Sequence, residues 1–141
     1  ILMVDDDAED RLLLSDAVKE ACQPHKLRFV RDGEELLDYL KRRGEYEEES
    51  SSPRPDLILL DLKMPRQDGR ESLRKLKTDA KLKRIPVVIL TASAARDDVN
   101  FCYDAHANAY MRKPNSFAEL LDLIGTISNY WFQLAELPSE K

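Results

Sequence analysis

Five short, mostly apolar runs recur along the chain, and the stretches between them have apolar residues at helical spacing. The runs cover residues 1–4, 27–30, 57–60, 86–91 and 109–111. A short apolar run bounded by polar residues is typical of a strand buried on both faces. Apolar residues three and four positions apart predict helices with one buried face. The pattern therefore predicts strand and helix in alternation, five times over.

Polar residues supply the expected starts of three helices. Asp32 can cap the helix after the second strand, and Asp68 the helix expected over residues 69–80. Ser116 and Glu119 have the spacing of a capping box at the start of the last helix. These caps agree with the helix positions that the apolar spacing predicts.

The first and last helices have the longest predicted apolar faces. Pro24 should end the first helix, and the fourth is expected over roughly residues 94–106. In the last helix the apolar spacing continues past Ile124 to the end of the chain. The face of the first helix is expected to comprise Ala8, Leu12, Leu13, Ala17, Val18 and Ala21, and that of the last Leu120, Ile124, Ile127, Trp131 and Leu134.

A single α/β domain is the expected organisation of all 141 residues. Right-handed crossovers place helices on both faces of a parallel sheet, so we predict an open, doubly wound five-stranded parallel sheet. Residues 45–55 contain four glutamates, three serines and two prolines, which predicts a solvated loop inserted before the third strand. Residues 116–141 are expected to form an extended C-terminal helix and tail.

Composition and charge exclude several classes of function. The net charge of −5 does not provide the broad basic surface that nucleic-acid binding requires. The chain also has no apolar stretch near the roughly 20 residues that cross a bilayer. Cys22 and Cys102 are isolated, which argues against a disulfide framework or a zinc site. We therefore expect a cytoplasmic protein that binds neither nucleic acid nor membrane.

Polar side chains gather at the predicted carboxyl ends of the strands. Asp5 and Asp6 end the first strand, Asp61 the third and Thr91 the fourth, and Lys113 follows the fifth. In open α/β sheets, ligands bind at this edge. The sequence thus predicts one site made from four separate segments.

The residue types at this edge suit phosphoryl chemistry. Asp5, Asp6 and Asp61 would crowd three carboxylates together, and a hard cation such as Mg²⁺ would relieve their repulsion. Lys113 and Thr91 can donate hydrogen bonds to a phosphoryl group. Asp61, the central acid, is then the expected nucleophile, and its product would be an aspartyl phosphate.

Each of these residues also has a simpler interpretation. An acidic run is most often a solvated helix start, Thr91 could cap the next helix, and Lys113 could be a surface charge. We interpret Asp7 only as a helix cap. The common location of the others at one sheet edge favours the functional interpretation.

Four segments resemble the receiver domains of two-component response regulators. They are VDDD at 4–7, DLILLDLKMPRQDG at 56–69, PVVILTAS at 86–93 and AYMRKP at 109–114. The resemblance spans essentially the whole chain and implies the flavodoxin-like strand order 2-1-3-4-5. It also implies phosphorelay signalling, with a sensor histidine kinase as donor and a protein-binding surface that responds to phosphorylation.

The resemblance assigns a role to each residue of the acidic cluster. By this resemblance Asp61 is the phosphoacceptor and Asp6 a direct Mg²⁺ ligand. Asp5 would be a second ligand or would hold a metal-bound water. Lys63 would contribute its backbone carbonyl.

Residues of the fourth and fifth strands also receive roles from the resemblance. Thr91 and Lys113 would contact the phosphoryl group, and the peptide bond between Lys113 and Pro114 is expected to be cis. Tyr110 matches an aromatic position that turns inward when Thr91 is drawn toward the phosphate, although it could simply be a half-buried strand residue. Lys63 and Ser93 occupy positions that adjust the phosphoryl lifetime.

A narrower resemblance is to the small phytochrome-associated response regulators. It rests on the acidic loop, the run DGRESLRKLKTDAKLKRIPVVIL and the ending NYWFQLAELP. It implies a phytochrome-type kinase, a homodimer and a chain without an attached output domain. Trp131, Phe132 and Leu134 are the candidate dimer residues, and the alternative is that they extend the core.

Two other functions remain open at this point. The first is a small Mg²⁺-dependent phosphatase or phosphotransferase, which needs a second acidic residue two positions after the nucleophile. Lys63 occupies that position. The second is an adaptor that is no longer phosphorylated, and the complete set of site residues argues against it. A receiver domain that acts as a phosphoacceptor, not as an enzyme, is the favoured interpretation.

Overall fold

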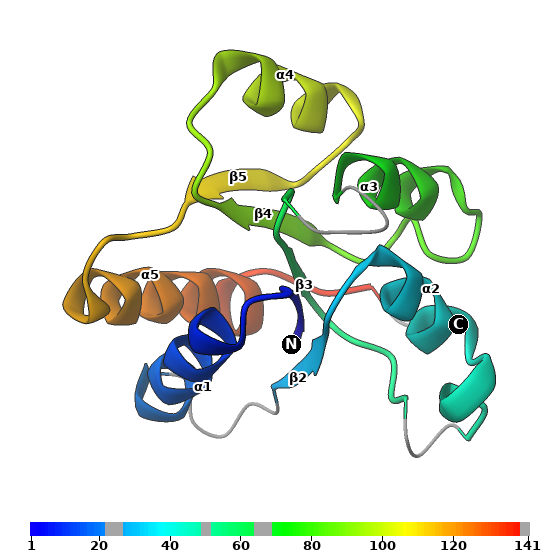
Figure 1. Ribbon diagram of the computed structural model, residues 1–141, viewed down its shortest axis with the longest axis horizontal. Helices are drawn as coiled ribbons and strands as arrows, with labels where there is room; N and C mark the ends of the chain where they lie inside the picture. The colour runs from blue at the N-terminus through cyan, green and yellow to red at the C-terminus, as the bar shows by residue number, and fades with distance from the viewer. Residues whose placement is uncertain (22–26, 49–51, 64–68, 139–141) are drawn as a thin grey trace.

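The five strands form one parallel sheet in the order β2-β1-β3-β4-β5 (Figure 1). Strand β1 pairs with both β2 and β3, so that Leu2 lies opposite Arg28 on one side and Ile58 on the other. The predicted strand order is confirmed. The strands are β1 (Leu2–Val4), β2 (Arg28–Val30), β3 (Ile58–Leu60), β4 (Val87–Thr91) and β5 (Ala109–Arg112).

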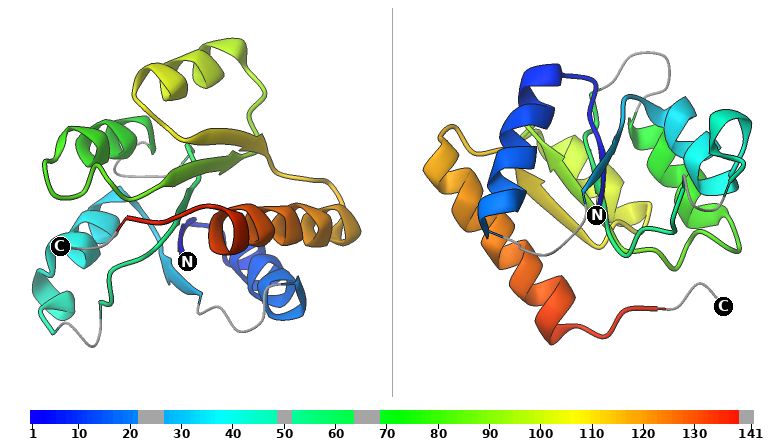
Figure 2. Two further views of the ribbon diagram at one scale, coloured as in Figure 1. Left: turned by 180° about the vertical axis from the view of Figure 1, so that it is seen from behind. Right: turned by 90° about the horizontal axis from the view of Figure 1, so that it is seen from below.

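Helices cover both faces of the sheet, as the alternating pattern predicts. Helices α1 and α5 pack together on one face, and α2, α3 and α4 lie on the other (Figure 2). A 3-10 turn, η1, follows α2, and a π-helical turn, η3, extends α5. The bounds are α1 (Ala8–Ala21), α2 (Gly33–Lys41), η1 (Gly44–Tyr46), α3 (Gly69–Thr78), α4 (Arg96–Asp104), α5 (Phe117–Asn129) and η3 (Tyr130–Leu134).

This computed structural model describes residues 1–21, 27–48, 52–63 and 69–138. The predicted helix end at Pro24, the thiol of Cys22 and the predicted cap at Asp68 lie outside the described residues. None of the described helices is both long enough and apolar enough to span a bilayer.

The strands are buried on both faces because successive side chains point into opposite layers. In β1, Leu2 and Val4 join the layer with α2, α3 and α4, whereas Met3 joins the layer with α1 and α5. In β3, Ile58 and Leu59 divide in the same way. Continuous apolar strands therefore supply two cores.

Side-chain caps fix the starts of three helices. Asp32 accepts a hydrogen bond from the Glu35 amide at 2.8 Å, as predicted. Ser116 Oγ accepts one from the Glu119 amide at 3.2 Å, also as predicted. Asp7 accepts one from the Glu9 amide at 2.9 Å, so its interpretation as a helix cap is confirmed. Each cap satisfies a backbone donor that the helix leaves unpaired.

The predicted apolar face of α1 is partly wrong. Leu12 and Leu13 are 64% and 46% exposed, whereas Ala17 and Val18 are buried as predicted and Leu14 is buried with them. Three consecutive leucines cover more than half of a helical turn, so their periodicity alone does not select a face. The buried face of α1 is instead determined by its packing against α5 and the sheet.

The described glutamates of the acidic segment before β3 are exposed, as a solvated loop predicts, but both ends of the segment are packed, which was not predicted. Ser52 is only 1% exposed, and its hydroxyl donates to the Tyr46 carbonyl at 3.0 Å. The Tyr46 ring packs against Tyr39, with ring centroids 5.2 Å apart, and the Tyr39 hydroxyl donates to the Pro53 carbonyl. The aromatic ring and the backbone carbonyls give this polar segment a way to pack against α2.

The C-terminal aromatic residues serve the core in part. Trp131 and Phe132 are half-buried against the layer of α1 and α5, which agrees with the alternative that they extend the core. Leu134 is 69% exposed, and Tyr130 is exposed beside Trp131. The three candidate dimer residues therefore differ in how much of their surface is exposed.

Candidate functional site

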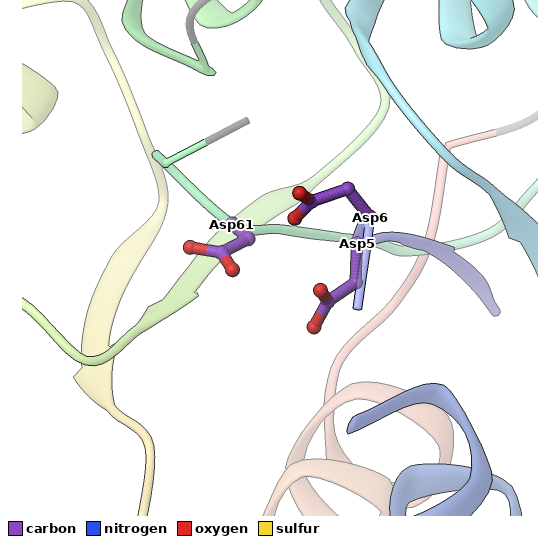
Figure 3. Close-up of side chains that lie close together, drawn as sticks. All are labelled: Asp5, Asp6 and Asp61. Atoms are coloured by element: carbon purple, nitrogen blue, oxygen red, sulfur yellow. The ribbon is translucent and has the colours of Figure 1, made fainter. Parts of the chain in front are cut away.

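Three carboxylates lie together beyond the ends of β1 and β3 (Figure 3). Asp5 and Asp6 follow β1, and Asp61 follows β3. One carboxylate oxygen from each residue lies within 4.8 Å of the others, and Asp5 and Asp61 are buried whereas Asp6 is exposed. The structure thus brings together all three predicted acidic residues.

Backbone hydrogen bonds fix these acids at the sheet edge. The Asp5 amide donates to the Val30 carbonyl at 3.1 Å, and the Asp61 amide donates to the Val4 carbonyl at 3.1 Å. The parallel ladders therefore continue for one residue beyond the strands. Arg11 Nη1 also donates to the Asp5 carbonyl at 2.8 Å, which ties α1 to the same turn.

Gly69 allows α3 to begin directly against the turn that carries Asp61. Its amide donates to the Leu62 carbonyl at 3.0 Å. A Cβ atom at residue 69 would collide with the backbone of Asp61 and Leu62. Only glycine permits this close approach.

Lys113 links the acids to the segment after β5. Its ammonium donates to one carboxylate oxygen each of Asp5, Asp10 and Asp61, at 2.9, 2.8 and 2.9 Å. Burial lowers the pKa of Lys113, but the hydrogen bonds to these three carboxylates outweigh burial and raise the pKa above its ordinary value. The Lys113 side chain therefore stays protonated and positively charged.

Asp5 is the most deeply placed acid of the group, with only 1% of its surface exposed. Burial raises its pKa, while hydrogen bonds from Lys113 and the Asp7 amide act in the opposite direction. Three carboxylates contact the one ammonium, and Asp6 adds a fourth carboxylate beside Asp5 and Asp61. The surplus of negative charge and the all-oxygen donor set fit a hard divalent cation.

Thr91 and Lys63 complete the contacts of Asp61. The Thr91 hydroxyl donates to Asp61 Oδ1 at 2.9 Å, and the Lys63 amide donates to the same oxygen at 3.2 Å. Lys113 contacts the other oxygen, Oδ2. One carboxylate oxygen of Asp61 is thus held from the end of β4, by Thr91, and the other from the segment after β5, by Lys113.

Tyr110 is half-buried, and its hydroxyl donates to the Ser93 carbonyl at 2.8 Å. Burial raises the pKa of Tyr110, so the phenol stays protonated and remains a donor. Thr91 thus contacts Asp61, whereas Tyr110 contacts the loop after β4, two residues beyond Thr91.

The site contains polar contacts that were not predicted from the sequence. Ser93 Oγ donates to Asp98 Oδ2 at 2.6 Å, and Arg70 pairs with Asp98 Oδ1 at 3.2 Å. These contacts join α3, α4 and the loop after β4. The contact of Asp10 with Lys113 was also missed, although its position in the first turn of α1, three residues after the cap Asp7, would have placed it near the same edge.

Comparison with known proteins gives the family. The model of the response regulator receiver domain matches residues 1–125. The chain is 41% identical over 139 residues to the response regulator Rcp1 of Synechocystis sp., covering 99% of this chain and 92% of that protein.

Two solved structures are similar over almost their whole length. The phosphorylated cyanobacterial phytochrome response regulator RcpA has a TM-score of 0.89 at 42% identity, with 98% of this chain and 96% of that chain covered. The Mn²⁺-bound form of Rcp1 has a TM-score of 0.88 at 40% identity, with 98% and 97% covered. The strands have the order expected of a receiver domain, and the family model covers residues 1–125. The chain therefore belongs to the response regulator receiver domains and is related to the phytochrome response regulators.

Proposed function

We propose that this receiver domain accepts a phosphoryl group on Asp61 from a phosphohistidine of a sensor kinase. One observation carries the proposal: Asp61 contacts Thr91 and Lys113 while it shares the acidic cluster with Asp5 and Asp6. A carboxylate held between two donors and a metal-competent cluster suits nucleophilic attack on phosphorus.

In the proposed step, an Asp61 oxygen forms a bond to phosphorus as the bond between phosphorus and the histidine nitrogen breaks. The departing imidazole keeps the electron pair and takes up a proton. Lys113 and Thr91 then donate to oxygens of the transferred group instead of to Asp61 alone. Donors aimed at developing charge lower the barrier because they need no rearrangement at the moment of reaction.

Mg²⁺ is the cation that we propose for the acidic cluster. Asp5, Asp6 and Asp61 would hold it, together with the Lys63 carbonyl. When bound, the cation would neutralise charge on the carboxylates and on the phosphoryl oxygens. The donor set supports a hard cation, and the similar protein Rcp1 has been solved with Mn²⁺.

Thr91 and Tyr110 are the proposed switch residues. Movement of the Thr91 hydroxyl from Asp61 to a phosphoryl oxygen would change the space beside Tyr110, whose hydroxyl is bound to the Ser93 carbonyl. The signal would thereby reach the loop after β4 and α4, the surface that we propose for a downstream protein partner.

The proposed donor is a kinase of the phytochrome type. The similarity to Rcp1 and to the phytochrome response regulator RcpA supports this assignment. We propose a signalling role and not an enzyme, because Lys63 occupies the position where a phosphatase of this chemistry needs a second acid. The protein would then catalyse only its own phosphorylation and dephosphorylation.

A homodimer through the C-terminal turn is part of the same proposal. Leu134 and Tyr130 expose apolar surface next to the half-buried Trp131 and Phe132. Changing Leu134 to Glu should lower the mass measured by light scattering from two chains to one, whereas the same change at the exposed polar residue Gln133 should leave it unchanged. A monomeric wild-type protein at high concentration would end the dimer proposal.

The decisive experiment is the intact mass of the protein after incubation with acetyl phosphate, with and without Mg²⁺. We expect one Mg²⁺-dependent phosphoryl adduct on the wild type and none on Asp61→Asn, whose side chain is nearly isosteric. Asp56→Asn, an exposed acid just before β3, is the matched control and should label normally. Equal labelling of Asp61→Asn would refute the phosphoacceptor, and an unlabelled wild type would favour the adaptor alternative.

A further inference from the structure

Asp10 is the acid at the site that the receiver chemistry leaves without a role. It lies in the first turn of α1, and its carboxylate accepts a hydrogen bond from Lys113 Nζ at 2.8 Å. An ammonium has three hydrogens, and Lys113 directs them to Asp5, Asp10 and Asp61 together, each within 2.9 Å. Asp10 therefore does not displace the other two acceptors, because all three contacts form simultaneously.

Packing leaves some room beside the Lys113 side chain. It borders a small cavity of about 60 Å³ between β1, β4, α1 and α5, whose apolar wall includes Met3, Leu14 and Leu90. A flexible four-carbon stem beside open space has several rotamers of similar energy. The position of the ammonium therefore depends on its hydrogen-bond partners.

Two of these partners change during the proposed reaction. Asp5 and Asp61 belong to the cluster of carboxylates that can hold a cation, and the Asp61 carboxylate becomes an acyl phosphate in the proposed reaction. Asp10 lies outside that cluster of Asp5, Asp6 and Asp61. Of the three carboxylates that hold Lys113, it is the one whose chemistry stays the same throughout.

Asp10 itself is held in place by α1. Its amide lies 3.3 Å from the side-chain oxygen of the helix cap Asp7, and the positive end of the helix dipole favours a carboxylate in this first turn. Helix α1 also packs along α5, which begins shortly after Lys113. The ion pair thus connects the reacting lysine to a rigid element.

We propose that Asp10 is a positioning residue, which keeps the Lys113 ammonium at the phosphoryl site before and after the group is transferred. This inference rests on the proposed phosphorylation of Asp61. Loss of the Asp10 charge lets the lysine turn toward solvent, so the donor that stabilises the transferring group is in place for a smaller fraction of the time. The phosphorylation rate then falls, although the nucleophile and the metal-binding acids are intact.

The test compares the initial rate of adduct formation from acetyl phosphate at saturating Mg²⁺ in four proteins. Wild type and Asp10→Asn differ only in charge at nearly constant shape. Asp10→Glu restores the charge on a longer stem, and Asp16→Asn removes an exposed acid from the same helix. We expect Asp10→Asn to be about tenfold slower, because the Lys113 ammonium loses one charge-assisted hydrogen bond and occupies the phosphoryl site less often, and Asp16→Asn to match the wild type.

Two readouts separate positioning from a structural role. Asp10→Glu should recover most of the rate, and the urea midpoint of Asp10→Asn should stay close to that of the wild type. A residue needed only for folding would lower the midpoint and the rate together. Wild-type or faster labelling of Asp10→Asn would overturn the positioning role while leaving the proposed function intact. Failure of the wild type itself to label would overturn both.

Discussion

Two lysines, at opposite edges of the same sheet, each donate to three oxygens, yet the oxygens differ in charge. Lys113 at the carboxyl edge contacts three carboxylates. Lys77, in the last turn of α3 at the amino edge, contacts the carbonyls of Lys83 and Ile85 and the side-chain oxygen of Asn108, at 3.0–3.1 Å. Both side chains are partly buried.

The difference appears in the pKa of the two ammonium groups. Burial lowers the pKa of Lys77, whereas the carboxylates raise that of Lys113. Neutral oxygens satisfy the hydrogens of Lys77 but do not neutralise its charge. Lys77 therefore holds the starts of β4 and β5 to the end of α3, and Lys113 supplies positive charge at the proposed reaction site. Equal hydrogen-bond counts do not imply equal roles.

The largest expected effect separates the two lysines by activity. Lys113→Met should slow adduct formation from acetyl phosphate by about a hundredfold, the usual cost of removing one donor to developing negative charge. Lys77→Met should label within about twofold of the wild type, because its contacts lie at the other edge of the sheet. The intact mass followed over time gives both labelling rates. A similar loss of rate in the two variants would contradict the difference in role between the two lysines.

The second effect separates them by stability. Lys77→Met should lower the free energy of unfolding by about 1 to 2 kcal/mol, because the carbonyls of Lys83 and Ile85 and the side chain of Asn108 lose a donor. Lys77→Arg, which keeps the charge but changes the shape of the donor group, is the companion variant. Urea titration gives the values, and an unchanged midpoint for Lys77→Met would show that the fastening is weak.

The smallest effect concerns Asp5, the buried partner of Lys113. Its raised pKa means that the folded protein binds the proton more tightly than the unfolded chain, whose pKa is near 3.8. Ionised Asp5 therefore costs stability above its folded pKa, and the cost shrinks as the pH falls toward 3.8. Asp5→Asn should stabilise the metal-free protein near pH 7, by less than the other effects above. Thermal melts in chelator should show this advantage shrinking in acid, and a constant or growing advantage would contradict the sign.

Strand ends made much of the site predictable. Thr91 ends a strand, and Asp5, Asp6, Asp61 and Lys113 each follow one; a parallel sheet brings all carboxyl ends to one edge. The meeting of these strand ends depends only on the order of strands and helices along the chain, and the apolar pattern predicts that order. The structure places each of these side chains in the contacts that a single site requires.

Features that depend on tertiary packing were not predictable in this way. The orientation of α1, which exposes Leu12 and Leu13, depends on its seam with α5. The burial of Ser52 depends on the position of Tyr46 on Tyr39. Asp10 was missed because only the rotation of α1 about its axis directs a helical acid toward Lys113. In each case a periodic pattern fixes an element but not its rotation or its neighbours.

The tight start of α3 also bears on the approach of the proposed phosphoryl donor. Gly69 lies against the backbone of Asp61 and Leu62, and a Cβ atom there would displace the turn that carries Asp61. Thr91 and Lys113 contact the two carboxylate oxygens of Asp61. Because attack and departure are roughly in line in phosphoryl transfer, the leaving imidazole would lie on the side of phosphorus opposite Asp61. In the proposed transfer, the direction from which the histidine approaches therefore depends on how the Asp61 turn is held, and a residue without a side chain helps to hold it.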